Sequence, residues 1–419
     1  MSLIAVERDL TAQFAQAMAD LGLDGPAPLG LAVSGGGDSM ALMHLAQQWR
    51  GAALHVATVD HGLRADAAQE AAFVSEIACN LGLSHVTLSW NSWTRHGNLQ
   101  DAARQARRRL LADWARREGL QAVLLGHTLD DQAETFLMRL ARGSGVDGLA
   151  AMAPMKIVEG VRFLRPLLSV SRCELRDWLR MRALPWVDDP SNDDSSFARI
   201  KARQALEVLA PIGLTPSRLS DTAARMADAR EVLDAAAASA ARDICRFEHG
   251  DFVFDAARLD SLAQDTRHRL VARSLCEVAS NSYRPRLSAL RAALVSHSAT
   301  LHGCRLTRNA REVRITRELN AVRDLRAPLG APWDSRWSAI PPADTHPPPN
   351  LEIAPLGESG LALCPDRESW RLPRLSLLAS PAIWQGTRLI AAPLAGFSPE
   401  WHISARQPPE SLPSVPYSH

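Results

Sequence analysis

Residues 29–39 read LGLAVSGGGDS, and this stretch decides the fold. Residues 29–34 form a short apolar run that ends in glycines, and residues 38–50 carry apolar side chains at helical spacing. Consecutive glycines let backbone N–H groups converge on an anion, and the N-terminus of the following helix adds its dipole. The stretch therefore predicts a strand, a phosphate-binding loop and a helix, in that order.

The side chains of this loop suit a nucleotide. Ser34 and Ser39 can donate hydroxyl hydrogen bonds, whereas Asp38 would repel a bare phosphate and fits better as a Mg²⁺ ligand or a helix cap. No G-K-[ST] follows, so the loop is not a Walker A motif, and the dinucleotide pattern G-x-G-x-x-G is also missing. A plain glycine turn between strand and helix is the alternative interpretation.

Outward from this loop, strands and helices alternate over the first 150 residues. Such alternation predicts a doubly wound parallel sheet with helices on both faces. The further strands are expected at 53–60, 85–90 and 121–127, and the further helices at 66–82, 98–118 and 130–142.

Three separate segments point at one crevice of this sheet. The glycine loop, Asp60-His61 and Gly126-His127 all follow predicted strands directly. Ligands of open parallel sheets bind beyond the carboxyl ends of the strands. We therefore expect a nucleotide site where these segments meet.

A group of carboxylates opens the helix after the fourth strand. Asp130 and Asp131 lie about one helical turn before Glu134, so these side chains share a face. Such a cluster can bind Mg²⁺ or hold an ammonium group, and Asp130 and Asp131 also suit helix N-capping.

Composition narrows the function classes. The chain has 419 residues and a formal charge of +1, so a nucleic-acid partner would need a local basic surface. Its six cysteines form no C-x-x-C pair, which disfavours zinc-ribbon and thioredoxin-like folds and fits reduced thiols in a cytoplasmic protein. No secretory h-region opens the chain, and no apolar stretch reaches the roughly 20 residues of a membrane helix.

A chain of this length exceeds one ordinary core, so several domains are expected. Residues 1–213 form the predicted nucleotide-binding catalytic domain. Residues 214–330 are rich in Arg and Ala with a helical pattern, and a Pro-rich connector at 340–350 interrupts a small irregular or β-rich module at 331–419.

The motifs resemble one family. SGGGDS is similar to the PP-loop of N-type ATP pyrophosphatases, which cleave ATP between the α- and β-phosphates and adenylate a substrate. Within that superfamily, VDHGLR (59–64) and GHTLDDQAET (126–135) resemble the tRNA(Ile) lysidine synthetase family, with Thr128 in place of a family His. DDPSN (188–192) matches the family pattern, and ARQARR (103–108) and RIKAR (199–203) continue the likeness with one departure each. The resemblance is dense over residues 29–205.

The resemblance implies an enzyme. Its reaction would join free lysine to carbon 2 of the wobble cytidine in a tRNA(Ile) with a CAU anticodon. ATP would adenylate the cytidine, pyrophosphate and AMP would leave, and Mg²⁺ would assist. By the same resemblance, residues 214–330 would form a helical tRNA-handling domain. A monomer or homodimer is expected.

The resemblance and the residues together assign roles, with ordinary surface arginines and structural histidines as the alternatives. Catalytic roles are predicted for Asp38, His127, Asp130, Asp131, Glu134 and Arg142, and metal binding for Asp38 and Asp131. ATP contacts are predicted for Ser34, Gly35, Gly36, Gly37, Asp38, Ser39, His61 and Arg64, and tRNA contacts for Arg104, Arg107, Arg108, Arg199 and Arg203.

Two other functions stay open at this point. A different adenylating enzyme on the same fold would act on a small molecule or another tRNA base. A non-catalytic RNA-binding relative would have no need of a pyrophosphate loop, so the intact SGGGDS and DDQAET runs argue against it.

Overall fold

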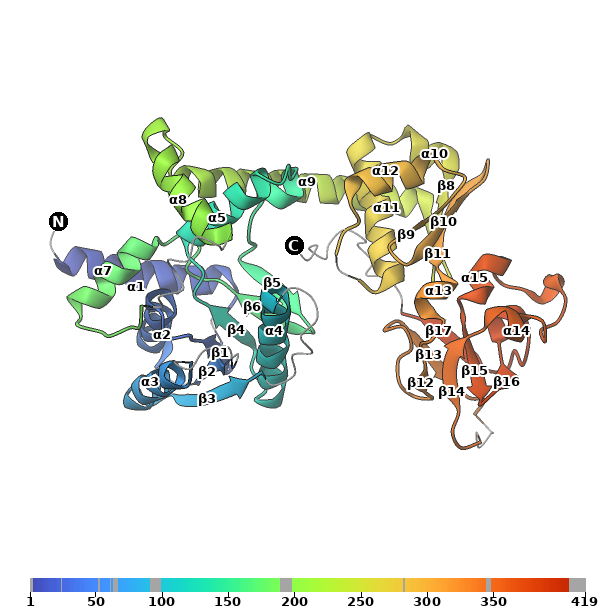
Figure 1. Ribbon diagram of the computed structural model, residues 1–419, viewed down its shortest axis with the longest axis horizontal. Helices are drawn as coiled ribbons and strands as arrows, with labels where there is room; N and C mark the ends of the chain where they lie inside the picture. Colours follow the sequence, from blue (N-terminus) through green and yellow to red (C-terminus); the bar gives the residue numbers. More distant parts are fainter. Residues whose placement is uncertain are drawn as a thin grey trace. The chain divides into compact units, whose positions relative to one another are not determined.

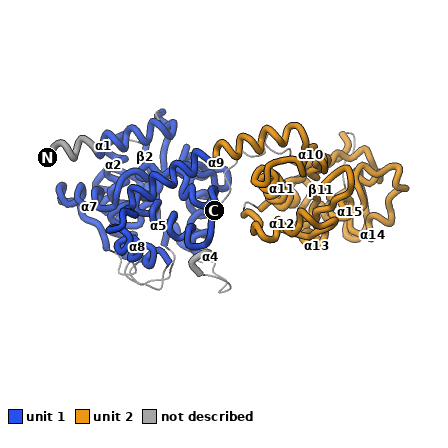
Figure 2. The backbone as a smooth tube through the Cα atoms, turned by 90° about the horizontal axis from the view of Figure 1, so that it is seen from above, with its two compact units in different colours: residues 1–230 blue, residues 231–419 orange. Residues whose placement is uncertain are grey.

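The computed structural model describes residues 3–23, 25–51, 53–60, 62, 67–90, 99–188, 198–281, 283–343 and 348–406. The chain forms two compact units, residues 1–230 and 231–419 (Figure 2). The boundary falls within the long helix α9 (Pro216–Ile244). The three-domain division expected from the sequence stays a prediction.

Unit 1 is built on a six-stranded sheet (Figure 1). Its strands lie in the order β3 (Ser84–Ser89), β2 (Leu54–Asp60), β1 (Leu29–Ala32), β4 (Ala122–Leu125), β6 (Val161–Leu164) and β5 (Met155–Val158). All pairings are parallel except that of the edge strand β5 with β6. The predicted parallel sheet is confirmed, and the β5–β6 hairpin extends it.

Helices cover both faces of this sheet, as a doubly wound fold requires. The predicted helices are present as α2 (Gly37–Arg50), α3 (Ala67–Asn80), α4 (Leu99–Arg117) and α5 (Leu129–Leu140). The structure adds α1 (Leu3–Asp20), α6 (Val146–Leu149), α7 (Arg172–Met181) and α8 (Ala198–Leu209), which the sequence pattern did not delimit.

Two apolar cores hold the helices to the sheet. One joins α1, α2 and α7 through buried side chains that include Phe14, Leu42 and Trp178. The other packs Leu111 and Trp114 of α4 against the opposite face. A Cβ at Gly30 of β1 would lie 2.7 Å from the Trp114 ring, so a glycine is needed for α4 to approach this closely.

Unit 2 begins with the expected helices, namely α9, α10 (Ala256–Ser261), α11 (Gln264–Ala279) and α12 (Leu287–Val295). A five-stranded antiparallel sheet accompanies them, which the Arg- and Ala-rich composition had concealed. Its order is β7 (Cys245–Glu248), β8 (Asp251–Asp255), β11 (Glu312–Arg317), β10 (Cys304–Arg308) and β9 (Ser298–Leu301). Phe254, Leu306 and Ile315 of these strands are buried in one core with α11.

The last part of the chain is β-rich, as predicted. A four-stranded sheet runs β12 (Ala327–Pro328), β14 (Glu352–Pro355), β15 (Pro381–Gln385) and β16 (Arg388–Ala391). A second pair joins β13 (Trp337–Ile340) to β17 (His402–Ala405), and the short helices are α13 (Leu319–Val322), α14 (Gly357–Leu361) and α15 (Arg374–Leu378). Among the described residues, no helix has the length and apolarity needed to cross a membrane.

Candidate active site

The glycine loop joins β1 to α2, as predicted. Gly35 has φ +90°, a conformation that favours glycine, and Gly36 is the N-cap of α2 without a side-chain acceptor. The Ser34 N–H donates to Oγ of Ser39 at 3.1 Å, and that hydroxyl donates to the Gly36 carbonyl at 2.9 Å. The loop is therefore shaped by its own short side chains, and the positive end of α2 stays open to an anion.

The segment after β4 lies directly against this loop. A Cβ at Gly126 would be 3.0 Å from the Asp38 carbonyl oxygen and 3.1 Å from Cα of Ser39. Two of the three segments predicted to share a crevice are thus neighbours. The third contains His61 and Arg64, which lie outside the described residues.

The start of α5 uses one of the predicted catalytic carboxylates as a cap. Thr128 is the N-cap, and its Oγ1 accepts a hydrogen bond from the Asp131 N–H at 3.4 Å. In return, Oδ2 of Asp131 accepts from the Thr128 N–H at 2.9 Å. The capping alternative is therefore correct for this oxygen of Asp131, while Oδ1 stays available for another partner.

Asp130 points elsewhere. Its Oδ2 accepts the backbone N–H of Arg172 at 2.7 Å, at the first turn of α7. That contact ties α5 to α7 and separates Asp130 from the other predicted catalytic carboxylates.

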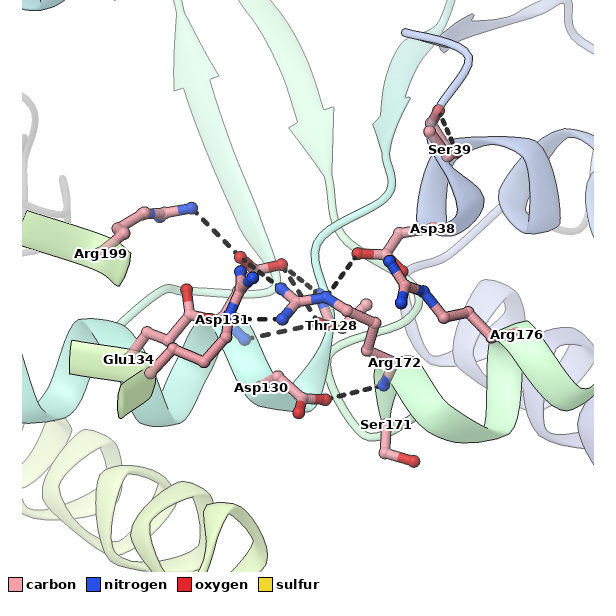
Figure 3. A network of polar contacts seen from close by, with 12 residues as sticks. Asp38, Ser39, Thr128, Asp130, Asp131, Glu134, Ser171, Arg172, Arg176 and Arg199 are labelled. Atoms are coloured by element: carbon pink, nitrogen blue, oxygen red, sulfur yellow. Dashed lines mark hydrogen bonds and ion pairs between the residues drawn. The ribbon is translucent and has the colours of Figure 1, made fainter. Parts of the chain in front are cut away.

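Three carboxylates surround the Arg172 guanidinium, and we call Asp38, Asp131 and Glu134 the carboxylate cluster (Figure 3). Nε of Arg172 lies 3.1 Å from Oδ2 of Asp38, Nη1 lies 3.3 Å from Oε1 of Glu134, and Nη2 lies 3.6 Å from Oδ1 of Asp131. One side chain therefore connects the glycine loop to helix α5.

Two further arginines approach the cluster from α8. Nη1 of Arg199 lies 3.1 Å from Oδ1 of Asp131, and Nε of Arg203 lies 3.1 Å from Oε1 of Glu134. Both residues were predicted to contact tRNA, which stays a prediction, and the structure brings both of them to the carboxylates. Three guanidinium groups thus balance three carboxylates.

Burial shapes the chemistry of the cluster. The Glu134 side chain is 1% exposed and that of Asp131 is 9% exposed. Burial raises the pKa of Asp38, because the attraction of Arg172 only partly offsets the loss of hydration. Burial also acts to raise the pKa of Asp131, but Arg199, His127 and Arg172 outweigh it and hold that pKa below its ordinary value.

Two carboxylate oxygens keep unused acceptor capacity. Oδ1 of Asp38 and Oε2 of Glu134 are buried and have no hydrogen-bond partner among the described residues. Buried acceptors of this kind suit a bound cation or a donor group of a ligand. The described residues contain no ready-made group of three His, Cys, Asp or Glu side chains around a metal position.

His127 follows β4 beside the cluster. Burial and, to a smaller extent, the neighbouring arginines together lower the pKa of its ring to about 3 against the attraction of Asp131. Its Nδ1 is buried without a hydrogen-bond partner among the residues described. A ring with this pKa is neutral and weakly basic at neutral pH, so it is poorly suited to accept a proton.

Arg107 of α4 precedes Leu111 and Trp114 by four and seven residues, so it lies on the same face of the helix as these apolar contacts. Arg104 is exposed, Arg107 and Arg108 are half-buried, and Leu111 and Trp114 are buried against the sheet, as expected. Burial lowers the pKa of Arg107, and the nearby charge of Arg199 adds to this effect. Arg142 is exposed in the turn after α5, outside the carboxylate cluster.

The sequence assigned no site role to Arg172, or to Arg165, whose charge acts on His127. Arg165 follows β6, is 9% exposed and donates to the Ala153 carbonyl at 2.7 Å; burial lowers its pKa to about 10. A local signal for Arg172 did exist. Residues 171–174 read SRCE, an S-x-x-E capping box that marks a helix beginning at this arginine.

The fold and the loop define a class: unit 1 is an ATP-binding PP-loop domain, and the PP-loop domain family matches residues 6–209. The tRNA(Ile)-lysidine synthase of Ruegeria pomeroyi is 46% identical over 94% of this chain and 95% of its own length. The enzyme of Bradyrhizobium sp. is 42% identical over 60% of this chain and 74% of its own length. The enzyme of Wolbachia pipientis wMel is 34% identical over 74% of this chain and 75% of its own length. The chain belongs to the tRNA(Ile)-lysidine synthase family.

Proposed function

We propose that this chain uses ATP to join free lysine to carbon 2 of the wobble cytidine in a tRNA(Ile) with a CAU anticodon. The observation that carries the proposal is the carboxylate cluster beside the PP-loop, since a cation site and a phosphate site adjoin through Asp38. Similarity over nearly the whole length of the Ruegeria relative supports the same activity.

The chemistry explains why ATP is needed. The oxygen on carbon 2 of cytidine is a very poor leaving group. Transfer of AMP to this oxygen releases pyrophosphate and turns the oxygen into part of a good leaving group. The ε-amine of lysine then attacks carbon 2, forms the new C–N bond and expels AMP, so two easier steps replace one difficult displacement.

The PP-loop handles the charge of the first step. The amides between Ser34 and Ser39 and the open end of α2 would bind the departing pyrophosphate. Oδ1 of Asp38 has the unused acceptor capacity that a Mg²⁺ ligand needs. Oδ1 of Asp131 would be the second ligand as long as no lysine ammonium group occupies that oxygen. Bound there, Mg²⁺ would neutralise phosphate charge.

The α5 carboxylates handle the second substrate. Glu134 and Asp131 would hold the lysine ammonium group through Oε1, Oε2 and Oδ1. An amine with a reference pKa of about 10.4 must lose a proton before attack. A carboxylate of the cluster is the better acceptor, since burial keeps the His127 pKa near 3; His127 would then help orient the base.

The remaining assignments concern the RNA and the assembly. Arg104, Arg107 and Arg108 of α4 would contact the tRNA backbone, and exposed Arg142 would contact phosphate. Arg199 and Arg203 would position the carboxylates. His61 and Arg64 would contact ATP. We expect a monomer or homodimer that works in the cytoplasm.

The test is AMP release from ATP by the purified chain with bulk bacterial tRNA, with and without labelled free lysine. AMP release that requires both tRNA and lysine, with label on the tRNA, is the expected result. AMP release indifferent to lysine would contradict the proposed nucleophile and favour another adenylating enzyme. No AMP release under any condition would contradict the enzymatic proposal and favour an RNA-binding relative.

A further inference from the structure

Arg172 contacts all three members of the carboxylate cluster, and its contacts are unequal. Oδ1 of Asp131 accepts Arg199 at 3.1 Å but lies 3.6 Å from Arg172. Oε1 of Glu134 lies 3.1 Å from Arg203 and 3.3 Å from Arg172. At Asp131 and at Glu134, Arg172 therefore makes the longer of the two contacts.

The backbone of Arg172 is fixed while its guanidinium has an alternative partner. The backbone N–H is held by Asp130 at the capped start of α7. Nε lies 3.1 Å from Asp38, on the side of the PP-loop. The guanidinium can leave Glu134 and Asp131 by side-chain rotation and still keep a negative partner.

An ammonium group matches the place that such a rotation would open. It has three N–H donors, and the α5 carboxylates offer Oε1 and the unpartnered Oε2 of Glu134 and Oδ1 of Asp131. The ammonium group would replace the guanidinium at Glu134 and Asp131 while Arg172 keeps Asp38 as its partner, so none of these buried carboxylates is left without a cation.

We propose that Arg172 occupies the ammonium position in the free enzyme and that the lysine substrate binds by displacing it toward Asp38 (Figure 3). The inference rests on the proposed function, which assigns lysine to Glu134 and Asp131. Arg172 would then lower the affinity for lysine by competing for the same carboxylates. Among substitutions at this position, only one with a cationic side chain should preserve that competition.

The experiment is calorimetric titration of L-lysine into the full chain with α,β-methylene ATP present throughout. Arg172→Gln removes the competing charge, so lysine should bind about tenfold more tightly, equivalent to ~1.4 kcal/mol. Arg172→Lys retains a competing cation and should stay close to the wild-type Kd. Arg172→Met gives a second uncharged variant of similar length should the Gln variant fail to fold.

Two controls separate competition from a general disturbance of α7. Arg180→Gln removes an exposed arginine of the same helix that pairs with Asp177, and lysine affinity should not change. Guanidinium chloride at millimolar concentration should weaken lysine binding to Arg172→Gln more than equal NaCl does, because it refills the vacated position.

The outcomes are distinguishable. If the wild-type chain binds lysine and both uncharged variants bind it equally well or more weakly, lysine does not displace Arg172. The proposed function would not be affected by that result. Equal tightening in Arg172→Lys and Arg172→Gln would also overturn the displacement of Arg172 by lysine. No lysine binding to any of these proteins overturns the inference together with the lysine site of the proposed function.

Discussion

The PP-loop and the carboxylate cluster adjoin, yet they are built in opposite ways. We propose that the loop binds anions through backbone amides, and its shape depends on residues within one hexapeptide, Ser34 to Ser39. The cluster is paired with three arginines, Arg172, Arg199 and Arg203, which are 38 to 69 residues away from Asp131 and Glu134. A site made of local groups tolerates changes elsewhere, whereas a site balanced by distant charges depends on the packing of several helices.

Asp38 belongs to both regions, so its removal should produce the largest effect. We expect Asp38→Ala to lower AMP release at least ~100-fold, because it removes the carboxylate beside the leaving pyrophosphate. Affinity for tRNA, measured by filter binding, should stay within about twofold of wild type. Asp177→Ala, on the exposed face of α7, is the matched control. Retained activity in Asp38→Ala would refute the metal assignment.

The contact between the two regions can be broken at Gly126. We expect Gly126→Ala to lower the free energy of unfolding by ~1–3 kcal/mol, because the new methyl group would press on the backbone of Asp38 and Ser39. Chemical denaturation followed by circular dichroism measures this change. Gly145→Ala has open space around its Cβ and a negative φ, so it should cost far less. If Gly126→Ala and Gly145→Ala have the same free energy of unfolding, the close contact of Gly126 with Asp38 and Ser39 does not contribute to stability.

Lowering the pH should destabilise the fold through protonation of His127, which lies beside the carboxylate cluster. Its pKa in the folded chain is about 3 against an ordinary 6.5, so below pH 6.5 the unfolded chain binds the proton first and stability is lost as pH falls. The loss should reach about 1.5 kcal/mol between pH 6.5 and about pH 5. His127→Gln should flatten this part of the stability curve, whereas exposed His402→Gln should not. A curve unchanged by His127→Gln would mean that the ring is not held neutral.

The smallest expected effect concerns the α4 arginines that we propose to contact tRNA, which belong to neither region. Arg107→Ala with Arg108→Ala should weaken tRNA binding and lower the slope of log K against log salt by about two. Arg117→Ala, at the other end of α4, should leave the slope nearly unchanged. If the double variant keeps the wild-type slope, this face of α4 is merely solvated.

The same contrast explains what could be predicted from the sequence. Strand, loop and helix around residues 29–50 follow from local periodicity and glycine chemistry, and their bounds match the structure closely. Arg172 could not be placed, since its pairing with Glu134 depends on how α7 packs beside α5. The five-stranded sheet of unit 2 was missed because its strands are only four to six residues long and lie among helices rich in Ala and Arg.

The capping box of α5 limits the denticity of Asp131. Its Oδ2 closes the first helical turn with Thr128, so only Oδ1 can reach a ligand without opening that turn. Any metal or ammonium group at Asp131 is therefore bound through a single oxygen. Binding through both oxygens would break the cap and unwind the start of α5. A ligand that draws on Oδ2 would therefore bind at the expense of the first turn of this helix.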